Sequence, residues 1–253
     1  QYRVYINSKQ RFTVAEISAT ARARELVLDV IEKEQVPQDE SKGGWVVFDC
    51  SSELGIERPL REYEIVSEVA ETRANVATDH FLLKRTELSP YLGIRSLPTS
   101  SPVLAGWVYV QERNKRKWNK RWLELREHAL FHAKSDKGKD EVQVCHMSSF
   151  DVYLVADASK IKAPKVHCFA VRSQDRIEMF EKPDQDYVHF FSLSDPAAHR
   201  DWVRAIMNAK TYMMRQEKAY LFKSLGGGRE GEAEGTTTGG GGGSLSRKST
   251  TRR

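Results

Sequence analysis

A helix with a tryptophan on its apolar face follows a long series of short strand-like runs between residues 103 and 218. Asp195 can cap this helix, and Pro196 can take its first position, where a missing N–H costs nothing. The apolar stripe of the helix consists of Trp202, Ala205, Ile206, Ala209 and Met213. We expect seven strands to form a bent barrel, and we expect this helix to close one of its two open ends. Eight strand-like runs are the candidates for these seven strands: 104–110, 120–126, 129–133, 141–146, 152–155, 167–172, 177–180 and 187–193.

Residues 1–88 have a different pattern of elements. Alternating apolar residues predict a hairpin in which Phe12 and Val14 point inward. A helix follows, capped by Ser18 or Thr20 and ended by Pro37, with apolar residues at helical spacing. Strands at 45–50, 58–60 and 81–85 and a short helix at 63–70 complete the order ββαββαβ. This order predicts a ubiquitin-like roll, so the fold class of the chain is α+β.

The composition divides the chain into four parts. We predict a first domain at 1–88, a Ser/Pro-rich linker at 89–102, a second domain at 103–218 and a flexible, low-complexity tail at 219–253. The chain begins inside a predicted strand, so we interpret it as a fragment of something longer. Three widely spaced cysteines and no CxxC argue for a reducing compartment. The net charge of +5 fits an anionic partner but does not identify one.

Two groups of segments resemble known families. The first group, TARARELVLDVIEKE, GGWVVFDC and ELGIERPLREYEIVSEV, resembles a Ras-association (RA) domain. The second group, GWVYVQERNKRKWNKRWLELR, KAPKVHCFAV and HRDWVRAIMNAK, resembles a pleckstrin-homology (PH) domain. Their order resembles the RA–PH tandem of the RIAM/lamellipodin adaptors and of the growth-factor-receptor-bound adaptors. The resemblance implies a non-catalytic adaptor in the cytoplasm, peripheral at the inner face of the plasma membrane, that binds a Ras- or Rap-type GTPase in its GTP form.

The RA resemblance implies that the exposed edge of the second strand pairs with a strand of the GTPase. The GTPase surface is acidic, so the edge should be basic. If Phe12 and Val14 point inward, then Arg11, Thr13 and Ala15 point outward. The candidate GTPase-binding residues are Lys9, Arg11, Thr13, Arg22 and Arg24. Ordinary solvated basic residues are the alternative reading, and Glu16 on the same strand does not favour an acidic partner.

The PH resemblance implies a phosphoinositide pocket built from basic residues on the first two strands. Here Val110 and Asn119 stand where two of those residues are expected, and only Arg121 is in place. The loop is nevertheless very basic, which favours weak attraction to anionic phospholipid. Trp118 could enter the membrane interface or pack inside. The candidate lipid-binding residues are Arg113, Lys115, Arg116, Lys117, Lys120 and Arg121. A solvated hairpin loop is the alternative, and no motif supports nucleic acid.

No catalytic constellation is recognisable. Neighbouring Cys145–His146 and His167–Cys168 point to opposite faces of a strand, so neither pair offers two ligands to one metal ion. We expect no enzyme activity, no cofactor and no metal. Two other functions remain open: a scaffold with a degenerate RA domain and a protein-binding PH domain, and the targeting region of a larger GTPase regulator.

Overall fold

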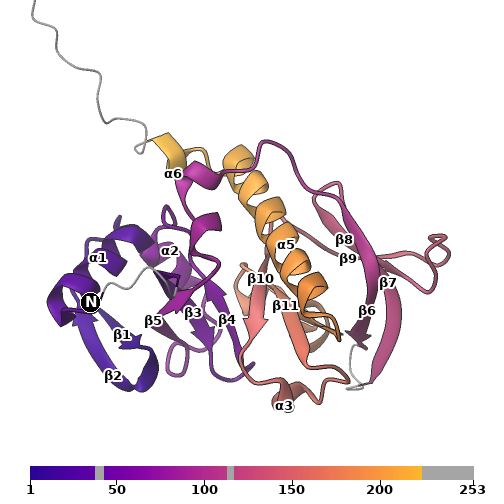
Figure 1. The fold of residues 1–253 in the computed structure, drawn as a ribbon, viewed down its shortest axis with the longest axis horizontal. Coiled ribbons are helices and arrows are strands. Elements are labelled where there is room, and N and C mark those ends of the chain that lie inside the picture. The colour runs from indigo at the N-terminus through magenta and orange to yellow at the C-terminus, as the bar shows by residue number, and fades with distance from the viewer. Residues whose placement is uncertain (38–42, 113–116, 224–253) are drawn as a thin grey trace, which may run out of the picture.

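The computed structural model describes residues 1–37, 43–112 and 117–223. The first part is a five-stranded sheet crossed by one long helix, as expected for a ubiquitin-like roll (Figure 1). Its strand order is β2-β1-β5-β3-β4, with β1 and β5 parallel. The elements are β1 Tyr2–Ile6, β2 Ser8–Ala15, α1 Ala23–Glu34, β3 Gly44–Ser51, β4 Ile56–Pro59, α2 Val66–Glu71 and β5 His80–Thr86.

The helix α1 begins later than the sequence predicts. Its N-cap is Arg22 rather than Ser18 or Thr20, and the Glu25 carboxylate accepts the backbone N–H of Arg22 at 2.9 Å. The free N–H groups of the first turn bond to backbone carbonyls of residues 62 and 64. A loop from the same domain therefore replaces the side-chain cap. The helix ends at Gln35, which takes the left-handed conformation, before Pro37 is reached.

Seven strands and a C-terminal helix form the second part. The strands are β6 Leu104–Gln111, β7 Trp118–Arg126, β8 Ala129–Ala133, β9 Val142–His146, β10 Phe150–Val155, β11 His167–Ser173 and β12 Val188–Leu193. The expected strand at 177–180 is instead the 3₁₀ turn η4 Ile177–Met179. Two single-turn helices, α3 Ala158–Ile161 and α4 Pro183–Asp186, lie in the connections.

Helix α5, Pro196–Glu217, closes the barrel. Asp195 accepts the N–H of Ala197 at 2.9 Å and Pro196 is the first residue of the helix, as predicted. Trp202 and Ile206 are buried in the barrel core, where the Trp202 ring lies 6.4 Å from that of Phe169. Among the described residues, no helix is both long and apolar enough to cross a bilayer.

The connection between the two parts is ordered. The 3₁₀ turns η2 Ser89–Tyr91 and η3 Ile94–Ser96 occupy the segment that the sequence predicts to be a linker. Leu92 is buried and joins Val46 and Phe48 of β3 in the same apolar cluster as the barrel core. The two halves therefore share a hydrophobic core across their junction.

Strand pairing also continues across the junction. Strand β4 pairs with β10 through Glu57↔Leu154 and Ile56↔Val155, which makes one twelve-stranded sheet. Figure 1 shows α5 beside β10 and β11, close to the boundary with the ubiquitin-like part. At one end of this sheet lies β2.

Candidate functional surfaces

Strand β2 faces the opposite way from the sequence prediction. Thr13 and Ala15 are buried, whereas Phe12 and Val14 are exposed. The register explains the reversal, because Thr13 lies opposite buried Val4 and Phe12 lies opposite half-buried Tyr5. Thr13 therefore belongs to the packed side of the sheet, and its prediction as an outward GTPase contact is wrong in orientation.

Arg11 lies beside the C-terminal end of α1. Its guanidinium group pairs with the Glu34 carboxylate at 2.7 Å and donates to the backbone carbonyl of Glu34 at 3.2 Å. The hydrogen bond from Arg11 lowers the pKa of Glu34. Arg11 stays about half exposed, so this surface ion pair is weak and does not remove the arginine from contact with a partner. Lys33 lies nearby and donates to the backbone carbonyl of Val14 at 2.7 Å.

The other three predicted GTPase contacts do not gather at this edge. Lys9 is exposed and bonds to the Ser52 hydroxyl at 2.8 Å, at the tip of the β1–β2 hairpin. Arg22 donates to the backbone carbonyls of Tyr63 and Leu221, at the junction. Arg24 lines an apolar groove of α1 and β3 in the first turn of the helix, about 15 Å along the helix axis from Glu34. The five residues therefore do not form the single basic face that was expected.

A further set of side chains beside β2 was missed by sequence reasoning. The Arg3 guanidinium lies 4.7 Å from the centre of the Phe12 ring, which packs edge-on against Tyr5. Phe12 is 49% exposed and Val14 is 38% exposed. We define the β2 edge patch as Arg3, Arg11, Phe12, Val14 and Lys33. The sequence signal that could have revealed this set is Arg3. Once the register of the hairpin is known, Arg3 lies opposite Val14, on the exposed face of β2.

The open end of the barrel holds the pocket that the PH resemblance implies. Val110 and Asn119 face each other in register, and Arg121 follows on the same side of β7. Glu112 also lines this cavity of about 360 Å³, which we call the inner pocket. Its carboxylate accepts a hydrogen bond from the Asn119 amide. A carboxylate and two neutral residues thus stand beside the single arginine. This lining is poorly suited to a tightly held polyphosphate group.

The predicted lipid-binding residues divide between two faces and an undescribed segment. Arg113, Lys115 and Arg116 lie outside the described residues. Arg121 points to the inner pocket, whereas Lys120 points outward with its ammonium 5.2 Å from the centre of the Trp107 ring. Lys117 is exposed. Lys120 and Arg121 therefore do not contribute to one site, because adjacent residues of a strand face opposite ways.

Trp118 packs inside rather than standing free. Its indole N–H donates to the carbonyl of Ile161 at 3.3 Å, and the ring packs against the cluster around Tyr153 and Phe190. Trp107 is 42% exposed.

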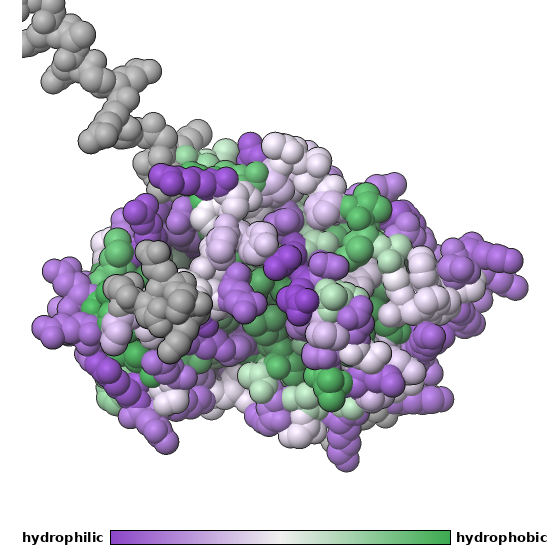
Figure 2. Space-filling view, viewed as in Figure 1, coloured by the Kyte–Doolittle hydropathy of each residue, from purple (hydrophilic) through white to green (hydrophobic). Residues whose placement is uncertain are grey.

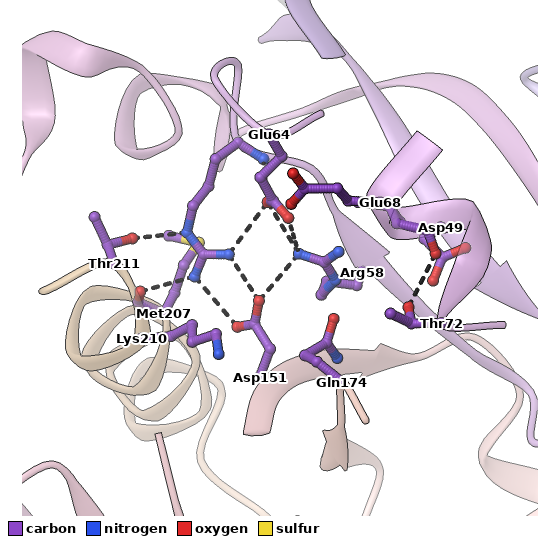
Figure 3. A network of polar contacts seen from close by, with 12 residues as sticks. Asp49, Arg58, Glu64, Glu68, Thr72, Asp151, Gln174, Met207, Lys210 and Thr211 are labelled. Atoms are coloured by element: carbon purple, nitrogen blue, oxygen red, sulfur yellow. Dashed lines mark hydrogen bonds and ion pairs between the residues drawn. The ribbon is translucent and has the colours of Figure 1, made fainter. Parts of the chain in front are cut away.

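The junction contains a buried ionic network (Figure 3). Asp151 of β10 points toward the ubiquitin-like part and pairs with Arg58 at 3.0 Å and with Arg61 at 2.7 Å. Glu64 pairs with the same two arginines, at 2.8 Å and 3.3 Å. Helix α5 closes the network, since Arg61 donates to the Thr211 hydroxyl at 2.7 Å and to the Met207 carbonyl at 2.9 Å. Arg58, Arg61 and Asp151 are each at most 2% exposed.

The network fixes the charges of its members. Burial alone would raise the pKa of Asp151, but Arg61 and Arg58 outweigh it and lower that pKa to about 2. Burial lowers the pKa of neighbouring Lys210 to about 8, against the attraction of Asp151. Each buried charge of the network is paired with a group of opposite charge, and removing one partner of such a pair is costly. The network therefore links Arg58, Arg61 and Glu64 of the first half to Asp151 and helix α5 of the second.

The segment after α5 forms a further contact across the junction. Residues 219–223 were predicted to belong to the flexible tail, but Tyr220–Lys223 form the short helix α6. Leu221 is buried beside Tyr63 and Met214, and the Phe222 ring lies 4.6 Å from that of Tyr63. The Tyr220 hydroxyl donates to Glu68 at 2.8 Å. The shared apolar cluster, the strand pairing, the ionic network and α6 thus join the two halves at four places.

The fold and these surfaces define the class of protein as a ubiquitin-like domain joined to a PH domain. Residues 102–211 match the family model of the PH domain. The coiled-coil, RA and PH domains of lamellipodin have a similar structure, with a TM-score of 0.65 and 18% sequence identity. That match covers 86% of this chain and 91% of the lamellipodin chain. The chain therefore has the fold of an RA–PH tandem, similar to that of lamellipodin.

Two curated relatives resemble the chain in sequence. The amyloid beta A4 precursor protein-binding family B member 1-interacting protein of Xenopus laevis is 26% identical over 201 residues, which are 66% of this chain and 30% of that protein. Growth factor receptor-bound protein 10 of Rattus norvegicus is 25% identical over 198 residues, 66% of this chain and 33% of that protein. The chain thus spans about a third of the length of these relatives.

Proposed function

We propose that the chain is a non-catalytic adaptor that binds a Ras- or Rap-type GTPase in its GTP form through β2 and an anionic membrane through its PH domain. The observation that carries this proposal is the position of β2 at one end of the twelve-stranded sheet. An edge strand offers backbone N–H and C=O groups to a strand of a partner. The proposal places the protein in the cytoplasm, peripheral at the inner face of the plasma membrane.

The β2 edge patch supports an acidic partner with an apolar contact at its centre. Arg3, Arg11 and Lys33 surround the edge with positive charge, which favours association with an acidic strand. Phe12 is a large exposed aromatic side chain on a rigid strand, the kind of residue that dominates the binding energy of interfaces. We therefore propose that the GTPase contacts the β2 edge patch rather than the expected basic face that included Lys9, Arg22 and Arg24.

A first prediction concerns the charges at the edge. Arg11→Glu and Lys33→Glu are each expected to weaken binding of the GTP-loaded GTPase about tenfold or more, because each reverses a charge that faces the acidic strand. Arg24→Glu is the matched control, since Arg24 is an exposed cation of the same domain at the far end of α1. Binding is measured by titration against a panel of Ras-family proteins in both nucleotide states.

Two outcomes of this panel contradict the proposal. If no member prefers the GTP form, the GTPase role is wrong. If Arg24→Glu weakens binding as much as Arg11→Glu does, the GTPase contacts the start of α1 rather than the β2 edge patch.

A second candidate function is a scaffold whose PH domain binds protein. It is favoured by the inner pocket, where Val110 and Asn119 occupy positions that a phosphate-binding site needs to be basic, and where Glu112 adds a carboxylate. Sedimentation with anionic vesicles at low and moderate salt separates the two functions. A scaffold leaves the chain in the supernatant at every salt concentration, whereas a membrane-binding adaptor sediments at low salt.

A further inference from the structure

We propose that the membrane contacts the outside of the β6–β7 hairpin rather than the pocket inside the barrel; this rests on the proposed membrane role. We define the outer hairpin face as Trp107, Tyr109, Lys120, Trp122 and Lys165. The occupant that fits this face is the surface of an anionic phospholipid bilayer.

The strand register places these side chains together. Trp107 lies opposite Trp122, and Tyr109 lies opposite Lys120, so the four point to one side of the hairpin. The two indole rings pack edge-on with 5.5 Å between their centres. Residues of the other parity, such as Val108 and Leu123, are buried in the barrel core. The outer hairpin face therefore points away from the barrel core. Farther along the same side, Gln111 and Trp118 are covered by α3, since both donate to the Ile161 carbonyl.

The charges on this face are positive. Lys120 lies over the Trp107 ring, and the Lys165 ammonium lies 5.8 Å from the centre of the Tyr109 ring. Within the described part of the chain, neither lysine forms an ion pair with a carboxylate. On this side of β7, the acidic residue nearest to Lys120 along the strand is Glu124. Its carboxylate already pairs with the guanidinium of Arg126 at 3.7 Å. Lysines that rest on aromatic rings keep their charge available to lipid phosphates.

The apolar residues on this side also suit an interface between water and lipid. Tryptophan is enriched at the headgroup level of membranes because it has an apolar body and one polar N–H group. Val166, next to Lys165, is 77% exposed. Figure 2 shows an apolar spot among hydrophilic residues at the lower end of the molecule, where Figure 1 places the loop between α3 and β11. Exposed apolar side chains with cations around them are typical of a membrane contact rather than of a folding core.

The inner pocket lacks this combination. Its single arginine shares the cavity with Glu112, whose charge opposes a phosphate, and exposed aromatic side chains are missing from its lining among the described residues. Attraction to a surface needs several cations pointing the same way, with about 1 kcal/mol for each lysine near an anionic membrane. The outer hairpin face offers two such lysines and two tryptophans, of which Trp107 is 42% exposed.

The test is sedimentation of the chain with vesicles of phosphatidylcholine alone or mixed with phosphatidylserine. The double variant Lys120→Glu/Lys165→Glu is expected to bind the anionic vesicles at least about 30-fold more weakly than the wild type. The matched control is Lys137→Glu/Lys139→Glu, which makes the same charge change on exposed lysines beyond the end of β8. Arg121→Glu tests the inner pocket and is expected to have less than a threefold effect. Unchanged circular dichroism melting shows that each variant is folded.

A spectroscopic readout addresses Trp107 directly. Tryptophan emission of the wild type is expected to shift to shorter wavelength on anionic vesicles and to be quenched by brominated lipid. Trp107→Phe should lose most of both effects, because the other described tryptophans are less exposed.

The outcomes separate this inference from the proposed function. If the wild type ignores anionic vesicles, the membrane role itself fails. If the wild type binds but only Arg121→Glu weakens it, the membrane role stands and the outer hairpin face is wrong. Equal weakening by the control pair would also overturn it, because binding would then follow net charge alone.

Discussion

Replacing Asp151 with asparagine is expected to lower the free energy of unfolding by about 3–5 kcal/mol. The substitution keeps the shape of the side chain but removes the charge that pairs with both Arg58 and Arg61. Glu64 is then left as the partner of two buried guanidinium groups. An uncompensated buried charge is costly, because water no longer solvates it and no anion replaces that solvation.

Denaturant unfolding of wild type and variant measures this loss. The control is Asp140→Asn, which removes the ion pair between Asp140 and Lys134, at 3.3 Å, on the surface of the barrel. Both partners of that pair are more than half exposed, so the control should cost less than about 1 kcal/mol. Equal effects of the two substitutions would mean that the junction network does not hold the halves together.

The same network predicts a specific loss of stability in acid. The pKa of Asp151 is about 2 in the folded protein, against 3.8 ordinarily, so the folded state holds this carboxyl ionised more strongly than the unfolded state. Its contribution is therefore fully present above pH 5 and is lost as the pH falls from about 4 to about 2. The lost contribution is on the order of 2 kcal/mol.

The measurement is the difference in unfolding free energy between wild type and Asp151→Asn across this pH range. Other carboxyl groups are common to both proteins, so most of their titration cancels in the difference. The difference should be constant above pH 5 and should shrink as the pH approaches 2. A difference that grows in acid would have the wrong sign for a carboxylate stabilised by arginine.

The fold could be predicted from the sequence because its elements are set by local patterns. The stripe of Trp202 and Ile206 with the Asp195–Pro196 start predicted helix α5. The alternating runs predicted the seven barrel strands, and the order ββαββαβ predicted the ubiquitin-like roll. The strand predicted at 177–180 was wrong, because a segment with three apolar residues in four can form a strand or a single helical turn.

The direction of β2 could not be predicted from its own residues. Both alternating sets contain an apolar residue, and the larger side chains, Phe12 and Val14, are the ones that face outward. Which of the two sets of side chains faces the core is decided by the pairing of β2 with β1. The register of this pairing shifts between Tyr5 and Ile6. A shift of one residue exchanges the two faces of a strand, so the candidate contacts changed with it.

The junction was beyond sequence reasoning for another reason. Arg58, Arg61 and Glu64 lie close together in the sequence, but Asp151 is some ninety residues away. In the sequence these residues read as ordinary surface charges. A cluster of charges beside the buried strand residues Ile56 and Leu60 was the one signal that could have pointed to a buried network.

The ordered junction gives the proposed function its central claim: the GTPase-binding edge and the membrane-binding face belong to one rigid body and act together. Binding at one surface then holds the other at a high effective concentration near its own partner. A rigid link makes this effect depend on geometry, because the two surfaces engage together only if their fixed arrangement allows it.

Recruitment to vesicles that carry both signals tests this claim most directly. The chain is titrated against vesicles with a lipid-anchored, GTP-loaded member of the panel, with phosphatidylserine, or with both. We predict that vesicles with both signals bind about 100-fold more tightly than those with either alone. Binding to the combined vesicles that is no tighter than to the better single signal would contradict the account.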